Sequence, residues 1–79
     1  MRSKEIIPEH QELYKKIGKK LKDLRTAKGM SYIKLAAEIG IARNSYNLLE
    51  NGKINFQLSS LQLVLKYHNI SLSNFFRDL

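Results

Sequence analysis

The side chains that most often carry out catalysis are scarce in this chain of 79 residues. It has no cysteine, which excludes a disulfide scaffold, a thiolate zinc site and a cysteine nucleophile. Of the two histidines, His10 lies in a polar stretch, and His68 falls on an apolar face where we expect a packed, hydrogen-bonded side chain. No two acids have a spacing typical of a metal site, and the four glycines are scattered. We therefore predict neither an enzyme nor a protein that holds a metal or cofactor.

Basic residues are the abundant chemical feature of the sequence. The 14 Lys and Arg outnumber the 7 Asp and Glu, and the net charge is +7. Ten basic and three acidic residues lie between Lys15 and Lys53, whereas the rest of the chain holds four of each. A one-sided basic surface suits a polyanion, most often nucleic acid. The alternative is a solvated helix face, because five of the ten decorate one amphipathic segment (Lys15, Lys16, Lys19, Lys20 and Lys22).

Nothing in the sequence points to a membrane. No apolar run exceeds three residues, although apolar residues make up 43% of the chain and suffice for a small core. The N-terminal stretch MRSKEIIPEHQE is too polar for a secretory signal. We expect a soluble cytoplasmic protein with no membrane partner.

Helical periodicity begins near the N-terminus. Leu13, Ile17, Leu21 and Leu24 form one apolar stripe on a first helix that starts at Pro8 and stops at Gly29. Because glycine costs about 1 kcal/mol inside a helix relative to alanine, the regular helix could instead begin near Gly18. We assign residues 1–12 to a flexible or frayed segment and residues 13–79 to one compact, all-α, five-helix domain.

The other four helices are short and are separated by tight turns. Ser31 caps a second helix that ends at Gly40, and a third covers residues 42–51. A fourth helix covers about residues 57–68, and Ser71 caps the fifth. The residues that we expect to face inward on the fourth helix are Leu58, Leu61, Val64, Leu65 and His68.

The second and third helices form the feature that could perform recognition. They are joined at Gly40, and the third is apolar on one side and polar on the other. Its inner side holds Ala42, Ser45, Tyr46 and Leu49, and its outer side holds Arg43, Asn44, Asn47, Leu48 and Asn51. A helix built in this way can enter the major groove of DNA.

The types and spacing of particular residues in this region carry a family resemblance. They are Ala36, Gly40, Ile41, Leu49, Glu50 and Gly52, followed by the run ISLS at 70–73. About residues 15–77, including IGKKLKDLRTAKGMSYIKLAAEIGIARNSYNLLENGK and LSSLQLVLKYHNISLSNFF, resemble the Cro/repressor-type (XRE) helix-turn-helix family. The resemblance implies a compact five-helix domain that binds double-stranded operator DNA, usually as a symmetric homodimer.

The resemblance also implies roles for individual residues. The base-reading residues would be Arg43, Asn44, Asn47 and Leu48, since arginine suits guanine and asparagine suits adenine. For Arg43 the alternative is a phosphate contact or simple solvation. The phosphate contacts would come from Tyr32, Lys34, Asn51 and Lys53. Arg25 and Glu50 occupy the positions of a partly buried structural ion pair.

The sequence departs from the family pattern at five positions. Tyr32 replaces a glutamine, and Ala42 replaces a serine that caps the third helix. Tyr46 stands where isoleucine or valine is usual, so its hydroxyl must find a partner or the surface. Leu48 replaces a polar or basic residue, so it touches either a thymine methyl or a protein. Phe56 replaces a proline.

Apolar side chains near the C-terminus suggest a competing function as a protein-interaction module. We expect a possible dimer surface formed by Leu63, Tyr67, Phe75, Phe76 and Leu79, unless the two phenylalanines only close the core. A different protein partner is the alternative, for example a toxin that is neutralised by an antitoxin of this family. We expect no small-molecule ligand, because the chain has no room for a sensing domain.

Overall fold

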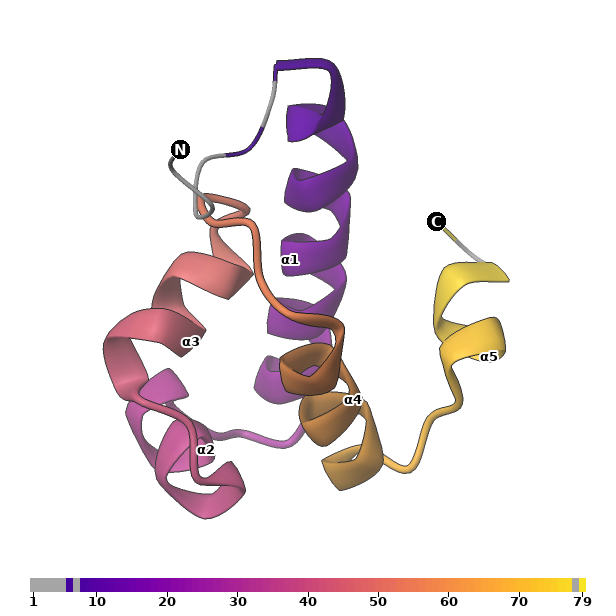
Figure 1. Cartoon of the computed structure of the whole chain (residues 1–79). Coiled ribbons are helices and arrows are strands. Elements are labelled where there is room, and N and C mark those ends of the chain that lie inside the picture. The colour runs from indigo at the N-terminus through magenta and orange to yellow at the C-terminus, as the bar shows by residue number, and fades with distance from the viewer. Residues whose placement is uncertain (1–5, 7, 78) are drawn as a thin grey trace.

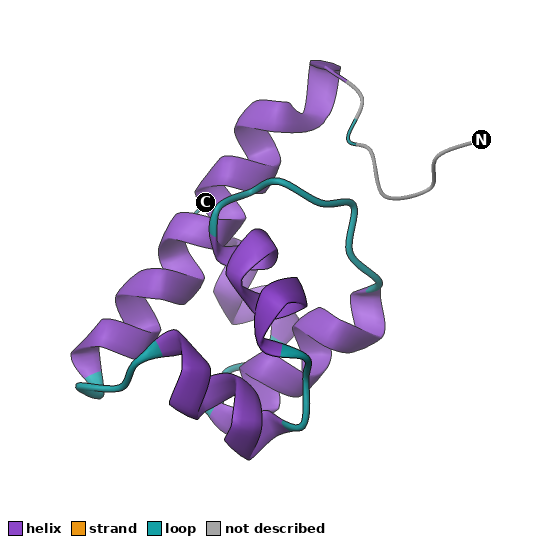
Figure 2. Ribbon diagram, turned by 90° about the vertical axis from the view of Figure 1, so that its left-hand side faces the viewer, coloured by secondary structure: helices purple, strands orange, loops and turns teal. Residues whose placement is uncertain are grey.

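The computed structural model describes residues 6, 8–77 and 79, and the regular secondary structure of this part of the chain is helical (Figure 1 and Figure 2). A short 3-10 turn, η1 (Pro8–His10), leads into α1 (Gln11–Ala27). The remaining helices are α2 (Tyr32–Ile39), α3 (Arg43–Glu50), α4 (Leu58–Tyr67) and α5 (Leu72–Arg77). The predicted all-α fold with five helices is therefore confirmed.

The first helix begins at Gln11, well before Gly18, which lies in its interior. Residues 1–5 and 7 of the segment expected to be flexible lie outside the described residues, and Gln11 and Glu12 already belong to α1. Tyr14 ties the early part of α1 to the α3–α4 loop: its hydroxyl donates to Asn55 Oδ1 at 2.7 Å, and its ring packs against Phe56 at 5.2 Å.

Local capping explains where the short helices begin and end. Ser31 Oγ accepts a hydrogen bond from the backbone N–H of Lys34 at 3.1 Å, and Ser71 Oγ accepts one from Asn74 at 3.2 Å. Gly40 ends α2 in the left-handed region at φ 89°, where a glycine is strongly favoured. Ala42 provides no side-chain cap for α3, as its residue type predicts.

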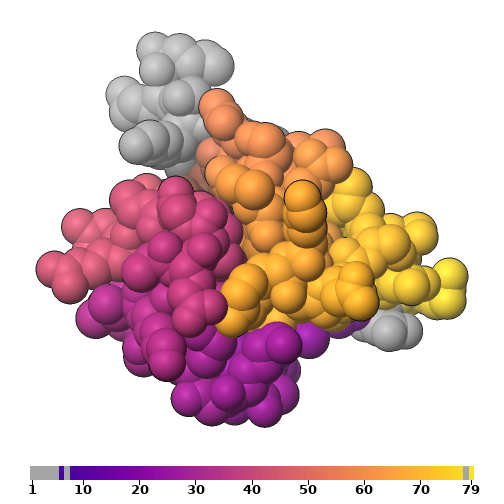
Figure 3. Space-filling view, turned by 90° about the horizontal axis from the view of Figure 1, so that it is seen from below, coloured from indigo at the N-terminus to yellow at the C-terminus, as the bar shows by residue number. Residues whose placement is uncertain are grey.

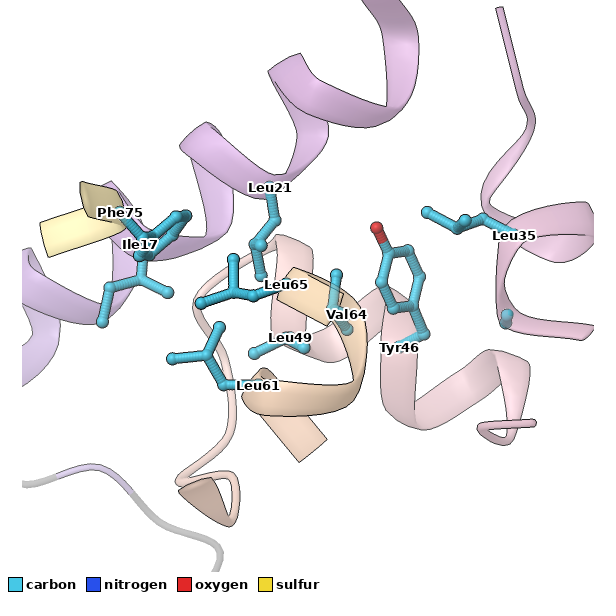
Figure 4. Packing of buried hydrophobic residues seen from close by; sticks show 10 residues of the cluster. Ile17, Leu21, Leu35, Tyr46, Leu49, Leu61, Val64, Leu65 and Phe75 are labelled. Carbon is cyan, nitrogen blue, oxygen red and sulfur yellow. The ribbon is translucent and has the colours of Figure 1, made fainter. Parts of the chain in front are cut away.

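Among the described residues, ten buried apolar side chains form one core, to which every α-helix contributes. They are Ile17, Leu21, Leu35, Ala36, Tyr46, Leu49, Leu61, Val64, Leu65 and Phe75. Figure 4 shows Phe75 with Ile17 at one end of the cluster and Tyr46 with Leu35 at the other. Four predictions of inward-facing residues are wrong. Ala42 and Ser45, expected on the inner side of the third helix, are exposed. Leu13 and Leu58 are 44% and 57% exposed. Both lie near the start of a helix, beyond the part that packs on the core.

Two residues of the predicted dimer surface make contacts within the chain itself. Phe75 is fully buried and closes the core, whereas its neighbour Phe76 is 40% exposed. Tyr67 is only half-buried, but its hydroxyl donates to Glu38 Oε1 at 2.9 Å and lies 3.3 Å from Met30 Sδ. This hydrogen bond raises the pKa of Tyr67 and links α4 to α2. Periodicity placed Tyr67 on the outer face of α4, where Glu38 of α2 reaches its hydroxyl while Leu63 remains exposed.

The corner where the α1–α2 turn, α2 and α4 meet lies on the face seen in Figure 3. Lys28 Nζ lies 5.6 Å from the centre of the Tyr67 ring, and His68 packs edge-on against the same tyrosine. Both ring nitrogens of His68 are buried without a hydrogen-bond partner among the described residues. The expectation that His68 is packed therefore holds, but the expectation that it is hydrogen-bonded is wrong.

His68 should make the stability of the fold depend on pH. Burial lowers the pKa of His68, and the positive charge of Lys28 lowers it further. The unfolded chain, with an ordinary histidine pKa of about 6.5, therefore binds a proton more readily than the folded chain. Stability should be fully present above about pH 7 and should fall as the pH drops through 6.5. Thermal melts at several pH values between 7.5 and 5.5 should show a smaller fall for His68→Leu than for the wild type, and equal falls would contradict this role.

Among the described residues, no helix combines the length and apolar character needed to cross a bilayer.

Candidate nucleic-acid interface

The outer side of α3 presents most of the side chains that the sequence assigned to base reading. Arg43 and Asn44 are exposed at its N-terminal end, and Leu48 is 39% exposed near its C-terminal end. The opposite side of the helix is buried through Tyr46 and Leu49. In helix-turn-helix proteins the N-terminal residues of the recognition helix contact base edges, so Arg43 and Asn44 have the position that this contact requires.

Asn47 and Asn51 contact each other. Asn51 Nδ2 donates to the backbone oxygen of Asn47 at 2.9 Å and to its side-chain Oδ1 at 3.2 Å. Asn47 is half-buried and its amide oxygen already accepts one hydrogen bond, whereas Asn44 is exposed. This pairing leaves Asn44 as the better-placed asparagine for reading a base.

The predicted phosphate contacts come from two separate places. Lys34 is exposed in the first turn of α2, while the neighbouring Tyr32 is half-buried and packs against the core. Asn51 and Lys53 are exposed beyond the C-terminal end of α3. Asn51 and Lys53 therefore follow the end of α3, whereas Lys34 lies on the helix before it, and contacts to the DNA backbone orient a recognition helix from positions of this kind.

A hollow at the C-terminal end of α3 brings in a basic residue that sequence reasoning did not single out. Lys15 of α1 lines this hollow together with Leu48, Asn51 and Lys53. The sequence could place Lys15 only on a solvated helix face, because nothing local indicates that α1 passes the end of α3. The hollow also contains Ile6 and Pro8, so Leu48 borders apolar groups of its own chain.

An ion pair joins α1 to α3 behind this surface. Arg25 Nε donates to Glu50 Oε2 at 2.7 Å, and Arg25 Nη2 donates to Glu50 Oε1 at 3.0 Å. A third hydrogen bond, from Arg25 Nη1 to the backbone oxygen of Met30 at 2.6 Å, holds the α1–α2 turn. The hydrogen bonding to Glu50 raises the pKa of Arg25 above its ordinary value. This bidentate arrangement fixes the orientation of α3 behind its exposed face.

Tyr46 lies beside this ion pair. Burial raises the pKa of the Tyr46 hydroxyl strongly, and the nearby Glu50 carboxylate raises it further. The hydroxyl is buried without a hydrogen bond of standard geometry to any described residue. Isoleucine or valine, which are usual in the family at this position, would have no hydroxyl to satisfy there.

Comparison with known proteins agrees with this geometry. A family model described as helix-turn-helix matches residues 21–75. The HTH-type transcriptional regulator PuuR of Escherichia coli is 33% identical over 61 residues, which are 77% of this chain but 33% of PuuR, so the chain spans about a third of that relative. The control protein C.MunI of a Mycoplasma species is 38% identical over 65 residues, covering 81% of this chain and 88% of C.MunI.

A solved structure extends the similarity to three dimensions. The restriction-modification controller protein C.AhdI from Aeromonas hydrophila has a TM-score of 0.75 and 30% sequence identity, over 84% of this chain and 96% of that one. The family match covers most of the chain, and the helices of the structure agree with it. This chain belongs to the helix-turn-helix family of Cro/repressor (XRE) type, a family of DNA-binding transcriptional regulators.

Proposed function

We propose that this protein is a transcriptional regulator that binds a specific double-stranded DNA sequence by inserting α3 into the major groove. The observation that carries the proposal is the exposed polar face of α3, with Arg43 and Asn44 at its N-terminal end and a buried core behind it. Arginine and asparagine are the side chains best suited to guanine and adenine edges. The proposal includes the cytoplasmic location that we expect from the sequence.

Charge around α3 supports the proposal. Lys15 and Lys53 line the hollow at the C-terminal end of α3, and Lys34 is exposed in the first turn of α2, the helix that precedes α3. Lysines in these places neutralise phosphates without reading sequence, and each neutralised phosphate makes affinity fall more steeply with salt.

We would first select binders from a random duplex DNA library at near-physiological salt. A recovered inverted repeat would support sequence-specific binding by a symmetric dimer, with half-sites about 34 Å apart. If no motif is recovered and binding disappears as the salt concentration rises, the basic surface provides only non-specific attraction, and the proposal fails.

Arg43→Ala is expected to relax the preference at one base position of the selected sequence. Loss of one bidentate contact should weaken binding to that sequence by about 1–3 kcal/mol, while binding to a scrambled duplex should change little. Lys53→Ala is the matched control, because loss of a phosphate contact should weaken both duplexes alike and reduce the salt slope by about one. Anisotropy titrations on the two duplexes measure both effects. Equal losses on both duplexes for Arg43→Ala would contradict its base-reading role.

Dimerisation is the second part of the proposal. Phe76 of α5 and Leu63 of α4 are 40% and 48% exposed, and an apolar surface of this kind favours a partner. A second copy would provide the two-fold symmetry of an inverted repeat. Phe76→Asp should therefore convert a dimeric mass to a monomeric one in light scattering, with folding checked by circular dichroism. A wild-type protein that is already monomeric at high concentration would exclude this dimer.

Within this function, we propose the role of a restriction-modification controller, because the chain matches two control proteins over most of their length. The chain covers 88% of C.MunI and 96% of C.AhdI but only a third of PuuR. A controller function predicts that the selected DNA sequence occurs next to genes of a restriction-modification system. Selected sites that lie next to genes of another kind would favour a different regulatory role, including that of an antitoxin.

A further inference from the structure

Two glycines allow the backbones of α1 and α3 to touch. A Cβ atom added to Gly18 in α1 would overlap the carbonyl oxygen of Glu50 and lie 2.7 Å from that of Leu49. A Cβ atom added to Gly52, which follows α3, would lie 2.7 Å from Cα and 2.8 Å from N of Lys15. Gly18 is therefore in contact with the last turn of α3, and Gly52 is in contact with the neighbouring turn of α1.

These contacts differ in kind from those at the glycines of the tight turns. Gly29 and Gly40 have positive φ angles of 69° and 89°, but a Cβ atom added to either would meet nothing within 4 Å. Gly29 and Gly40 are therefore needed only for the backbone conformation of their own turns. The neighbours of Gly18 and Gly52 are backbone atoms, which cannot move aside as the end of a flexible side chain can.

Gly18 has no local reason to be a glycine. It lies inside a 17-residue helix, where glycine costs about 1 kcal/mol relative to alanine. The close approach of α3 is the feature that only glycine permits. Glu50 makes two contacts with α1: its backbone contacts Gly18, and its carboxylate binds Arg25.

We propose that Gly18 and Gly52 are positioning residues that form a backbone seat and set the distance and tilt of α3 relative to α1. This inference rests on the proposed function, because the seat matters for DNA if α3 enters the groove. With a methyl group at position 18, the last turn of α3 must move away from α1. Arg43 and Asn44 would then shift relative to Lys15, which belongs to α1 and borders the DNA-facing surface.

Gly18→Ala tests the seat, and Gly29→Ala is the matched control. Both substitutions should lower the melting temperature, the first through a steric clash and the second through a strained φ angle. Both variants are compared in trimethylamine N-oxide, which favours the folded state. The ratio of affinities for the selected and scrambled duplexes should fall about tenfold or more for Gly18→Ala, the equivalent of a lost base contact, and less than about twofold for Gly29→Ala. A folded Gly18→Ala protein that keeps the wild-type ratio would overturn the proposal.

A second measurement separates this inference from the proposed function. Residual dipolar couplings of backbone amides report the orientation of α3 relative to α1 without DNA. We expect a changed orientation in Gly18→Ala and Gly52→Ala and an unchanged one in Gly29→Ala. If the wild type selects no DNA sequence, the proposed function fails. The dipolar couplings alone then decide whether Gly18 and Gly52 set the orientation of α3. If Gly18→Ala does not fold in the osmolyte, Gly52→Ala takes its place in both experiments. Wild-type orientation in the folded variants would overturn the seat.

Discussion

Glu50→Ala should destabilise the fold by about 3–5 kcal/mol, because it leaves the Arg25 guanidinium without its partner. The two side chains are only 11% and 4% exposed, and the pair is bidentate. A domain of this length has about 4–12 kcal/mol of total stability, so the variant would lose a large part of it. Urea denaturation followed by circular dichroism measures the loss.

Two controls separate the charge effect from a general effect of substitution. Lys19 and Asp23 form an exposed pair on the same helix at 3.1 Å, with side chains 76% and 64% exposed, and Asp23→Ala should hardly change the stability. The double variant Arg25→Met with Glu50→Leu should recover much of the loss, because an apolar pair leaves no buried charge. A double variant that is as unstable as Glu50→Ala would show that packing, and not the stranded charge, causes the effect.

Phe75→Ala should also destabilise the protein by about 3–5 kcal/mol, as is usual when a large aromatic side chain is removed from a core. Phe75 is fully buried, and Lys20 covers it from α1: the Lys20 Nζ lies 4.9 Å from the ring centre and donates to the Phe75 backbone oxygen at 2.6 Å. The substitution therefore opens a cavity at the end of the core where α5 packs. Thermal and urea denaturation measure the effect.

Phe76→Ala provides the neighbouring control. Its ring packs edge-on against Phe75 at 5.2 Å but is 40% exposed, so the loss of stability should be clearly smaller. If Phe76 forms a dimer contact, its effect should grow with protein concentration, whereas the effect of Phe75→Ala should be large at every concentration. Similar losses for both variants at low concentration would show that α5 packs differently from the structure described above.

The helices can be predicted from the sequence because helix ends depend on local chemistry. Ser31 and Ser71 cap helices through a backbone N–H three residues later, and Gly40 ends one in the left-handed region. The same local pattern identifies the outer face of α3 and hence Arg43 and Asn44 as candidates for reading bases. Each of these features depends on residues within one or two helical turns.

The sequence pattern does not predict which distant segments contact each other. Periodicity predicts that a face is apolar or polar, but it does not predict which neighbour covers that face. Tyr67 lies on an outer face by its spacing, yet α2 reaches it through Glu38. Phe75 and Phe76 are adjacent and chemically identical, and only the packing of α5 on α1 decides that the first is buried and the second exposed.

The sequence by itself therefore determined the helices, the basic region and the family to which the recognition surface belongs. Only the tertiary structure decided that Lys15 and Lys53 line the same hollow, that α2 reaches Tyr67 and that Gly18 contacts the end of α3. The physical reason is that local conformation is governed by neighbours along the chain. The distance between two helices is instead set by the side chains, or by the absence of a side chain, where they cross.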